Sequence, residues 1–308
     1  MTGPGDPHGL GGGGAGGKGP PDPLDDYRAL NDPQRRRQVE RRGGYFVVEG
    51  LLALEALLGS RYPVRSVLVT ERRADRVRAL VGDRAPLLVR PQDEVADVAG
   101  FNVHRGVLAA ADRLPPAGVA EAVGTSDLVV VTEGLGDHEN LGALFRNAAA
   151  LGAGAVLLDP TTADPLYRRS VRVSLGHVLR VPWARLAPLP GGLAEVTAIG
   201  LETAALTPAP GAVTIDDYAA DVASRRRAAA AADRPAAATD RPAAAGEAGP
   251  AAGAGRRVRV ALVVGAEGPG LTPATLAAAD RRVRIALAPG VDSLNVATAT
   301  AIALHRLS

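Results

Sequence analysis

The sequence predicts an α/β protein of two domains, a small one followed by a larger one built on a mostly parallel sheet. Short runs of branched apolar residues alternate with helix-like segments, which is typical of βαβ units. The 308 residues, with 46% hydrophobic content, fill two modest cores better than one large core. The segment LPPAG, at 114–118, carries prolines that favour a linker between the two series of strands.

Composition excludes several classes of site. The chain has no cysteine, which excludes disulfides, thiolate nucleophiles and cysteine-based metal centres, and we expect a cytoplasmic protein. No apolar run reaches the roughly 18 residues that span a bilayer, and the N-terminus lacks the pattern of a signal peptide. The formal charge is +2, with Lys18 the only lysine, so the positive charge is almost entirely arginine. Arginine binds phosphate bidentately, which modestly favours a nucleic-acid partner.

Residues 1–26 are rich in Gly and Pro, and we expect a disordered tail. Gly12 to Lys18 matches the phosphate-loop pattern G-x-x-x-x-G-K. However, Gly19 replaces the Ser or Thr that would hold magnesium, and no strand precedes the match. The match is therefore treated as accidental.

The first domain is expected over 27–113. The basic segment DPQRRRQVERRGG predicts a helix, YFVVEG a strand and LLALEALLGS a second helix. The segments VRSVLVTERR and HRGVLAAAD predict two further strands. A linker over 114–126 then leads to the second domain, over 127–308.

In the second domain, DLVVVTEG, AVLLDP, VLRVPW, RVRVALVVG and RRVRIAL predict strands. The segments LGALFRNAAALG and TPATLAAAD predict helices, as do Tyr167 to Gly176 and the chain from Leu294 onward. A helix and a weaker strand are expected over 191–215. The Ala-rich tract at 219–255 is expected to be a flexible insertion or a partly helical segment.

Three constellations stand at junctions between strand and helix. In ENLGALFRN, Asn140 is a reasonable helix N-cap, and Arg146 could form a surface salt bridge. In VVGAEGPGL, the glycines allow close approach of a ligand, and Glu267 suits a neutral or cationic ligand better than a pyrophosphate. In APGVDSLNVATATAIALHRL, Asp292 or Ser293 could cap the last helix, while Asn295 could satisfy nearby backbone.

Other common chemistries find little support. The histidines His104, His138, His177 and His305 are scattered, and none forms a spacing typical of metal ligands. No G-x-S-x-G elbow is present, so hydrolase chemistry is not indicated.

Taken together and in this order, the three segments NLGALFRNAAALGA, VVGAEGPGL and RIALAPGVDSLNVATATAIAL resemble the motifs of the SpoU (TrmH-like) family of SPOUT methyltransferases. The resemblance covers about 127–308. The N-terminal part, with YFVVEG and FNVHRGVLA, resembles the ribosomal-protein-like RNA-binding domain that often precedes this family's catalytic domain. The resemblance implies a SPOUT domain with a deep trefoil knot, a fold feature that sequence rules alone would not suggest.

The same resemblance implies transfer of a methyl group from S-adenosyl-L-methionine to a ribose 2′-hydroxyl of ribosomal or transfer RNA. Ribosomal RNA is slightly favoured because of the accessory domain. The resemblance also implies a homodimer with its site near the subunit interface, and neither a membrane nor a metal is expected to be involved.

By resemblance, the cofactor site comprises residues from three loops: Gly265, Glu267, Gly268, Ile285, Leu287 and Leu294. The catalytic set comprises Arg146, Asn140, Glu267, Ser293 and Asn295. Arg146 would polarise the hydroxyl or relay its proton through phosphate, because a guanidinium normally stays protonated. Glu267 could orient Arg146, and Ser293 and Asn295 could hold the loop, the substrate or both.

One departure from the family pattern is the segment Ile285 to Leu287, where the third motif often reads Ile-Pro-Met; here Ala286 replaces the proline. This change could alter the stiffness of the cofactor loop. An alternative function is a non-catalytic RNA-binding or ribosome-associated protein that retains the fold, and binding of S-adenosylmethionine would discriminate between the two.

Overall fold

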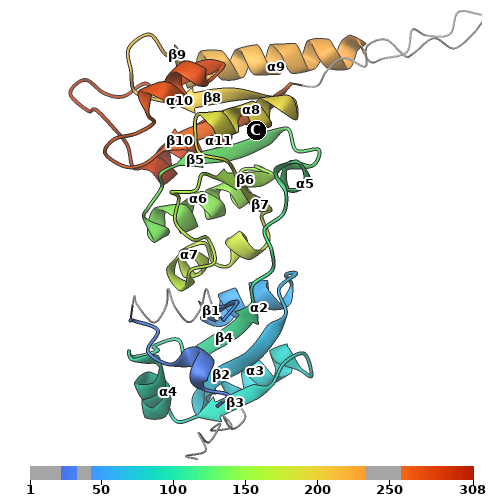
Figure 1. Ribbon diagram of the computed structural model, residues 1–308, viewed down its shortest axis with the longest axis vertical. Coiled ribbons are helices and arrows are strands. Elements are labelled where there is room, and N and C mark those ends of the chain that lie inside the picture. Colours follow the sequence, from blue (N-terminus) through green and yellow to red (C-terminus); the bar gives the residue numbers. More distant parts are fainter. Residues whose placement is uncertain (1–21, 33–42, 233–257) are drawn as a thin grey trace, which may run out of the picture.

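Two sheets, one in each domain, organise the chain (Figure 1). The computed structural model describes residues 22–32, 43–232 and 258–308. The accidental phosphate-loop match, the basic helix expected after residue 33 and the later part of the Ala-rich tract lie outside these described residues.

The N-terminal domain has a four-stranded sheet with the order β1-β4-β2-β3, in which only β2 and β3 are parallel. Its strands and helices, in chain order, are η1 (Asp25–Tyr27), β1 (Tyr45–Glu49), α2 (Leu51–Leu58), β2 (Val64–Thr70), η3 (Glu71–Arg73), α3 (Ala74–Val81), β3 (Leu87–Arg90), α4 (Gln92–Ala99) and β4 (Val107–Asp112). The strands expected from YFVVEG, VRSVLVTERR and HRGVLAAAD are confirmed. Strand β3 had no equivalent among the expected elements.

The expected tail extends too far along the chain. Leu24 and Tyr27 are buried against the N-terminal sheet. The Tyr27 hydroxyl donates to the Ser66 carbonyl oxygen at 2.7 Å and accepts from the Ala110 amide at 3.2 Å. The segment from Asp22 onward is therefore part of the domain, because the buried side chains of Leu24, Tyr27 and Leu30 and the Tyr27 hydrogen bonds offset part of the cost of ordering it.

The C-terminal domain has a seven-stranded parallel sheet with the order β7-β6-β5-β10-β8-β11-β9. Its strands and helices are α5 (Val119–Val123), β5 (Leu128–Glu133), α6 (His138–Ala150), β6 (Ala155–Leu158), α7 (Arg168–Val173), η4 (His177–Leu179), β7 (Trp183–Arg185), α8 (Gly191–Ala198), β8 (Leu201–Leu206), β9 (Val213–Thr214), α9 (Ile215–Ala232), β10 (Arg259–Gly265), α10 (Pro273–Ala278), β11 (Arg281–Arg284) and α11 (Val296–Leu307). The predicted α/β class with a mostly parallel sheet is confirmed.

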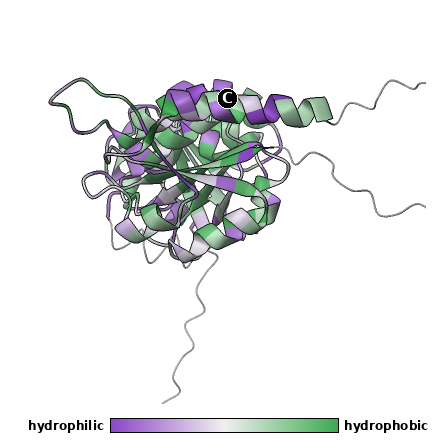
Figure 2. Ribbon diagram, turned by 90° about the horizontal axis from the view of Figure 1, so that it is seen from above, coloured by the Kyte–Doolittle hydropathy of each residue, from purple (hydrophilic) through white to green (hydrophobic). Residues whose placement is uncertain are grey.

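Helices cover both faces of this parallel sheet. Alternate side chains of β5 and β10 pack into two different cores, one with α6 and α11 and the other with α5 and α8. Because both faces of these strands are buried, their sequences are almost continuous runs of apolar residues. Figure 2 shows the hydrophobic strands enclosed between helices whose outer faces carry hydrophilic residues. Within the described residues, none of the helices has the length and apolar character needed to cross a bilayer.

Strand β10 lies between β5 and β8, although it follows both in sequence. The strand order therefore changes direction at β10. Ligands of open parallel sheets bind beyond the carboxyl ends of the strands at such a point. The trefoil knot implied by the resemblance stays a prediction.

Three expectations for this domain need correction. The expected linker includes α5, whose Val119 and Val123 are buried against the sheet. The strand expected in VLRVPW begins only at Trp183, because Leu179 ends the short helix η4. Residues 219–232 of the Ala-rich tract belong to α9, which excludes a flexible insertion over this part and agrees with the partly helical alternative.

Helix α9 is held by arginines at its middle. Arg226 donates to the carbonyl oxygens of Val258, Leu307 and Asp127 at 3.0, 3.0 and 3.3 Å. Arg225 donates to both carboxylate oxygens of Glu202, at 2.7 and 3.1 Å. These contacts join α9 to β8, β10 and the C-terminus, which a flexible insertion would not do.

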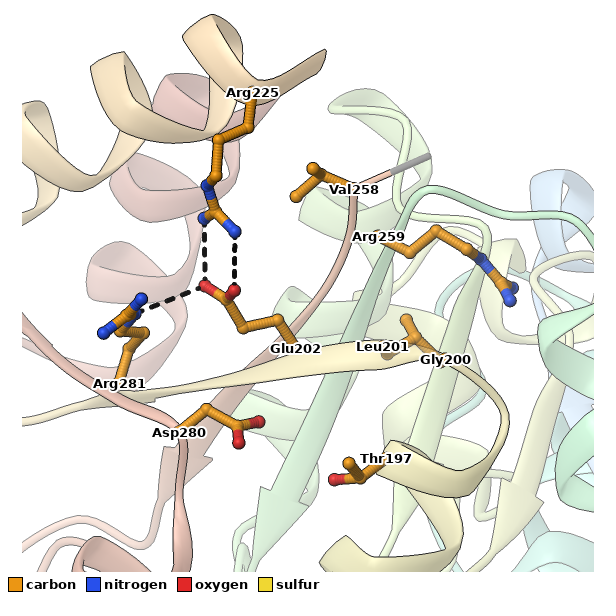
Figure 3. A pocket seen from close by; sticks show the side chains of 9 residues that line it. All are labelled: Thr197, Gly200, Leu201, Glu202, Arg225, Val258, Arg259, Asp280 and Arg281. Carbon is orange, nitrogen blue, oxygen red and sulfur yellow. Dashed lines mark hydrogen bonds and ion pairs between the residues drawn. The ribbon is translucent and has the colours of Figure 1, made fainter. Parts of the chain in front are cut away.

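Figure 3 shows Arg225 and Arg281 converging on Glu202 in a cavity of about 480 Å³ at the amino ends of the strands. The Tyr218 hydroxyl also donates to Glu202, at 2.8 Å. Burial raises the pKa of Glu202, but the hydrogen bonds from Arg225 and Tyr218 outweigh burial and hold it below its ordinary value of 4.5. The charges in this cavity thus satisfy one another, and we regard the cavity as structural.

The two domains meet through charged side chains. Glu49, at the end of β1, is buried and accepts hydrogen bonds from Arg168 and Arg172 of α7. Arg113 donates to both carboxylate oxygens of Asp164, at 3.3 and 2.8 Å. Paired and hydrogen-bonded charges at a buried junction favour one defined orientation of the domains.

Replacing Glu202 with Gln should lower the free energy of unfolding by about 2 kcal/mol at neutral pH, because the hydrogen bonds from Arg225 and the ion pair with Arg281 lose the carboxylate charge. A depressed carboxyl pKa stabilises the fold above the unfolded pKa, and this contribution disappears as pH falls through the folded pKa. The difference between wild type and Glu202→Gln should therefore shrink below about pH 4.5. Urea unfolding across a pH series measures it, with exposed Glu195→Gln as control; a pH-independent difference would contradict the charged role.

Candidate functional site

A cavity of about 360 Å³ lies at the carboxyl ends of β8, β10 and β11, where the strand order changes direction. Three loops line it, one after each of these strands. The residues that were expected to form the cofactor site all line this cavity: Gly265, Glu267, Gly268, Ile285, Leu287 and Leu294. Ser293 and Asn295 line it as well. Positions up to 30 residues apart are thus brought to one hollow, as the motifs predicted.

The first loop depends on a close backbone approach. A Cβ atom at Gly265 would lie 2.2 Å from the carbonyl carbon of Gly270, which no side chain could tolerate. Gly268 and Gly270 have φ angles of 86° and 68°, in the region that favours glycine. The loop therefore folds tightly back on itself and exposes its backbone to the cavity.

Glu133 anchors the far end of this loop, and the sequence motifs did not point to it. It is buried at the end of β5, beside Gly265 of β10. Its carboxylate accepts from the Thr272 amide at 2.9 Å, the Thr272 hydroxyl at 2.9 Å and the Thr275 hydroxyl at 2.7 Å. It thereby ties the start of α10 to the central strands. The only sequence signal was a carboxylate at the end of a mostly apolar strand.

Asp159, at the end of β6, supports the neighbouring turn in the same way. It accepts from the Gly134 amide at 3.0 Å and from the Thr162 amide at 2.8 Å. Burial raises the pKa of Asp159, but hydrogen bonds from Thr161, Thr162 and Gly134 outweigh it and hold the pKa below its ordinary value. The carboxyl ends of β5 and β6 are therefore both fixed by buried carboxylates.

Asn295 connects three segments of the site. Its side-chain oxygen caps α11 by accepting from the Ala297 and Thr298 amides, at 3.0 and 3.2 Å. Its amide nitrogen donates to the Glu267 carboxylate at 2.7 Å and to the Asn140 side-chain oxygen at 2.8 Å. This arrangement brings together three of the expected catalytic residues from three separate motifs.

The capping roles considered from the sequence are wrong in detail. Helix α6 is capped by Asp137, which accepts from the Glu139 and Asn140 amides at 2.8 Å. Asn140 is thus free to bond Asn295. Helix α11 is capped by Asn295 rather than by Asp292 or Ser293. Both caps are the residue directly before the helix, and propensity could not separate them from similar neighbours.

Arg146 is not part of this cluster. It lies six positions after Asn140 on α6, a rotation of about 240° around the helix axis. Asn147 marks the side that faces α11, where it donates to the Ala297 carbonyl oxygen at 2.8 Å. Gly142 marks the opposite side, where α6 packs closely on Ser170 of α7. Arg146 is exposed on that opposite side, and no hydrogen bond joins it to Glu267, Asn140 or any other residue of the described chain.

Residues that were not among the expected site residues also line the cavity. Leu206 is the last residue of β8, Thr207 and Pro208 follow it, and Ala299 lies in the first turn of α11. Leu206, Ile285, Leu287 and Leu294 make part of the wall apolar, whereas Glu267 carries a carboxylate. The cavity can therefore hold a ligand that combines an apolar ring with polar or cationic groups.

The described chain contains no grouping of His, Asp and Glu that could hold a metal ion. The polar groups that line the candidate site are the side chains of Thr207, Glu267, Ser293 and Asn295 together with backbone groups.

Replacing Glu133 with Gln should loosen the start of α10, because the neutral amide offers one acceptor oxygen where the carboxylate offers two. The Thr272 amide should exchange its hydrogen about tenfold faster, with thermal stability only slightly reduced. Hydrogen-exchange mass spectrometry or NMR measures this, and exposed Glu71→Gln provides the control. An unchanged rate at Thr272 would show that Glu133 does not hold the loop.

Comparison with known proteins identifies the family. The model of the SpoU rRNA methylase family matches residues 127–305, more than half of the chain. An uncharacterized tRNA/rRNA methyltransferase of Mycobacterium tuberculosis is 41% identical over 259 residues, which cover 83% of this chain and 78% of the relative.

Solved structures agree with the fold. The SpoU methyltransferase AviRb of Streptomyces viridochromogenes, in complex with S-adenosylmethionine, superimposes with a TM-score of 0.69 at 21% identity, covering 92% of this chain and 96% of that one. An RNA 2′-O-ribose methyltransferase superimposes with a TM-score of 0.66 at 25% identity, covering 92% and 94%. The chain belongs to the SpoU rRNA methylase family of RNA methyltransferases.

Proposed function

We propose that the protein transfers a methyl group from S-adenosyl-L-methionine to a ribose 2′-hydroxyl of RNA, with ribosomal RNA the first candidate substrate and transfer RNA the second. The observation that carries this proposal is the convergence of the loops after β8, β10 and β11 on one cavity at the carboxyl ends of the central strands, where the second and third of these loops carry the second and third motifs. Relatives described as tRNA/rRNA methyltransferases and a similar 2′-O-ribose methyltransferase structure support it.

The residues of the cavity suit the proposed cofactor. Ile285, Leu287 and Leu294 provide an apolar wall for an adenine ring, and the glycine loop exposes backbone groups for polar contacts. The Glu267 carboxylate favours a nearby positive charge, such as that of a sulfonium. The bound cofactor supplies an electrophilic methyl group.

The protein's own contribution is to place the acceptor hydroxyl and to assist loss of its proton. Asn295 holds Glu267 and Asn140 in one plane of hydrogen bonds, so these groups are preorganised at the rim of the cavity. Ser293 is the remaining polar side chain of the third loop on the cavity wall. We propose that Asn140, Glu267, Ser293 and Asn295 orient the ribose and that Arg146 polarises its hydroxyl.

Arg146 points away from the cavity of its own chain, so this role requires a second copy. We propose a homodimer in which Arg146 of one subunit reaches the cofactor cavity of the other. Val291 and Leu294, in the third loop, are 51% and 38% exposed, which favours a subunit packed over the loop. We further propose a cytoplasmic protein that needs no metal for this displacement.

The direct test combines binding with product analysis. The protein should bind S-adenosylmethionine in isothermal titration and label total ribosomal RNA from its tritiated form. Alkaline hydrolysis should then leave the label in dinucleotides, because a 2′-O-methyl group blocks cleavage of the adjacent phosphodiester. Label in mononucleotides would indicate base methylation. Cofactor binding without labelling of ribosomal or transfer RNA would favour a non-catalytic RNA-binding role.

Arg146→Ala should reduce methyl transfer by about 100-fold or more, because a charged donor at the reacting hydroxyl is lost. Its affinity for S-adenosylmethionine should stay within a few-fold of wild type, because Arg146 does not line the cavity. Arg227→Ala on α9 serves as the matched control. A fully active Arg146→Ala protein would remove Arg146 from the mechanism.

Mixing two inactive variants tests whether the site is shared. Arg146→Ala lacks the proposed donor, and Ala299→Phe fills the cavity. If subunits exchange and sites are composite, mixed dimers carry one intact site, and activity should recover to about a quarter of wild type. No recovery, with exchange verified by native mass spectrometry, would place Arg146 and the cofactor in the same subunit.

A further inference from the structure

Most arginines in the described chain are engaged by a carboxylate or a carbonyl oxygen, as Arg113, Arg168, Arg226 and Arg259 illustrate. A minority have no side-chain hydrogen bond or ion pair to another residue within 22–32, 43–232 and 258–308. These are Arg61, Arg72, Arg73, Arg76, Arg105, Arg146, Arg180, Arg227 and Arg282. An arginine without an internal partner is the kind of residue that is available to an external anion.

Arg61, Arg146 and Arg180 come together where the domains meet. Helix η4 packs against both α2 of the N-terminal domain and α6 of the C-terminal domain. Arg180 directly follows η4, and its guanidinium reaches the end of α2, with Nη2 3.8 Å from a Cβ placed at Gly59. Arg61 lies two residues beyond Gly59, with its guanidinium 5.3 Å from the centre of the Tyr62 ring.

His177, at the start of η4, connects these arginines to α6. Burial lowers the pKa of His177, and the guanidinium groups of Arg180 and then Arg146 lower it further. Helix α6 packs directly on η4, so Arg146, on the side of α6 that faces away from α11, lies on the same side of the molecule as His177 and Arg180. We call Arg61, Arg146, His177 and Arg180 the junction patch.

The surface around the patch is hollowed between the two domains. A cavity of about 370 Å³ is lined by Arg61 and Tyr62 from one domain and by Arg180 and Trp183 from the other. One carboxylate, that of Glu121, also lines it, and this group accepts from the Gly118 amide at 3.4 Å. Positive charge thus predominates over the length of the hollow, from α2 to η4.

We propose that the junction patch is a track for the phosphate backbone of the RNA substrate, leading from the domain junction to Arg146. This inference rests on the proposed function. Guanidinium groups without internal partners bind phosphate oxygens bidentately, and their spacing over two domains suits an extended polyanion better than a single small anion. RNA bound along the patch would end at the residue proposed to polarise the acceptor hydroxyl, next to the cofactor cavity of the second subunit.

The buried pairs of Glu49 with Arg168 and Arg172 give the track its geometry. They hold β1 against α7, and α7 packs directly under α6. The N-terminal and C-terminal parts of the patch therefore keep one relative position. A rigid track would let the N-terminal domain determine which ribose reaches Arg146.

The test uses the full-length protein with two charges removed, Arg61→Gln together with Arg180→Gln. Both side chains are exposed and have no polar partner in the described chain, so folding should be unaffected, as thermal melting would verify. The matched control removes two exposed charges that also have no polar partner in the described chain, Arg227→Gln on α9, at the end of the C-terminal domain far from the junction (Figure 1), together with Arg282→Gln on β11. The probes are fluorescein-labelled oligouridylate and total ribosomal RNA, titrated over a series of salt concentrations.

The patch variant should bind both probes about tenfold more weakly at low salt. For oligouridylate, the slope of log affinity against log salt should fall by about 1.4, the loss of two phosphate contacts on a single strand. Its affinity for S-adenosylmethionine should equal that of wild type. Equal RNA affinity and slope in the patch variant and the control variant would overturn the proposal, as would failure of the wild type to bind either probe. If the wild type shows no methyl transfer while the difference in RNA binding between the patch variant and the control persists, the proposed function fails and the track stands.

Discussion

The carboxamide of Asn295 is the interaction on which the candidate site depends. One side-chain oxygen caps α11, and one side-chain nitrogen holds both Glu267 of the glycine loop and Asn140 of α6. Each such hydrogen bond contributes about 1 kcal/mol, more where a carboxylate is the acceptor. The main effect of these hydrogen bonds is to position the site, because a single planar group fixes the relative positions of three segments that are far apart in sequence. Glu133 performs the same task at the back of the loop, where it binds Thr272 and Thr275.

These clamps explain why the site lies where it does. In a parallel sheet the carboxyl ends of all strands lie at the same edge. Where the strand order changes direction, at β10, the loops that follow adjacent strands run to opposite faces of the sheet, which leaves a hollow beyond Gly265. The opposite ends of the same strands also form a cavity, but there Glu202, Arg225 and Arg281 neutralise one another. The cavity at the carboxyl ends therefore has polar groups available to a ligand, whereas the charges of the cavity at the amino ends stabilise the fold.

Much of this could be predicted from sequence because the strands are continuous apolar runs and the three motifs stand at strand ends. The misses involve tertiary contacts. Tyr27 is held by hydrogen-bond partners in β2 and β4, and α9 is held by the hydrogen bonds from Arg226 to carbonyl oxygens at the ends of other elements. Both sets of partners are distant in sequence, so a local pattern could not predict them. Asp137 and Asn295 cap their helices, rather than chemically similar neighbours, because they are the residues at which the helical backbone begins. The direction of Arg146 follows from helical rotation once α6 has a defined neighbour on each side.

The central claim is that the three loops form one cofactor site. Isothermal titration of S-adenosylmethionine into wild type and Ala299→Phe tests it most directly, because Ala299 lines the cavity without belonging to any of the catalytic groups. The account predicts one binding event per subunit for wild type and its loss in Ala299→Phe, with an unchanged melting temperature for the free proteins. Equal binding by both proteins would place the cofactor elsewhere and contradict the account.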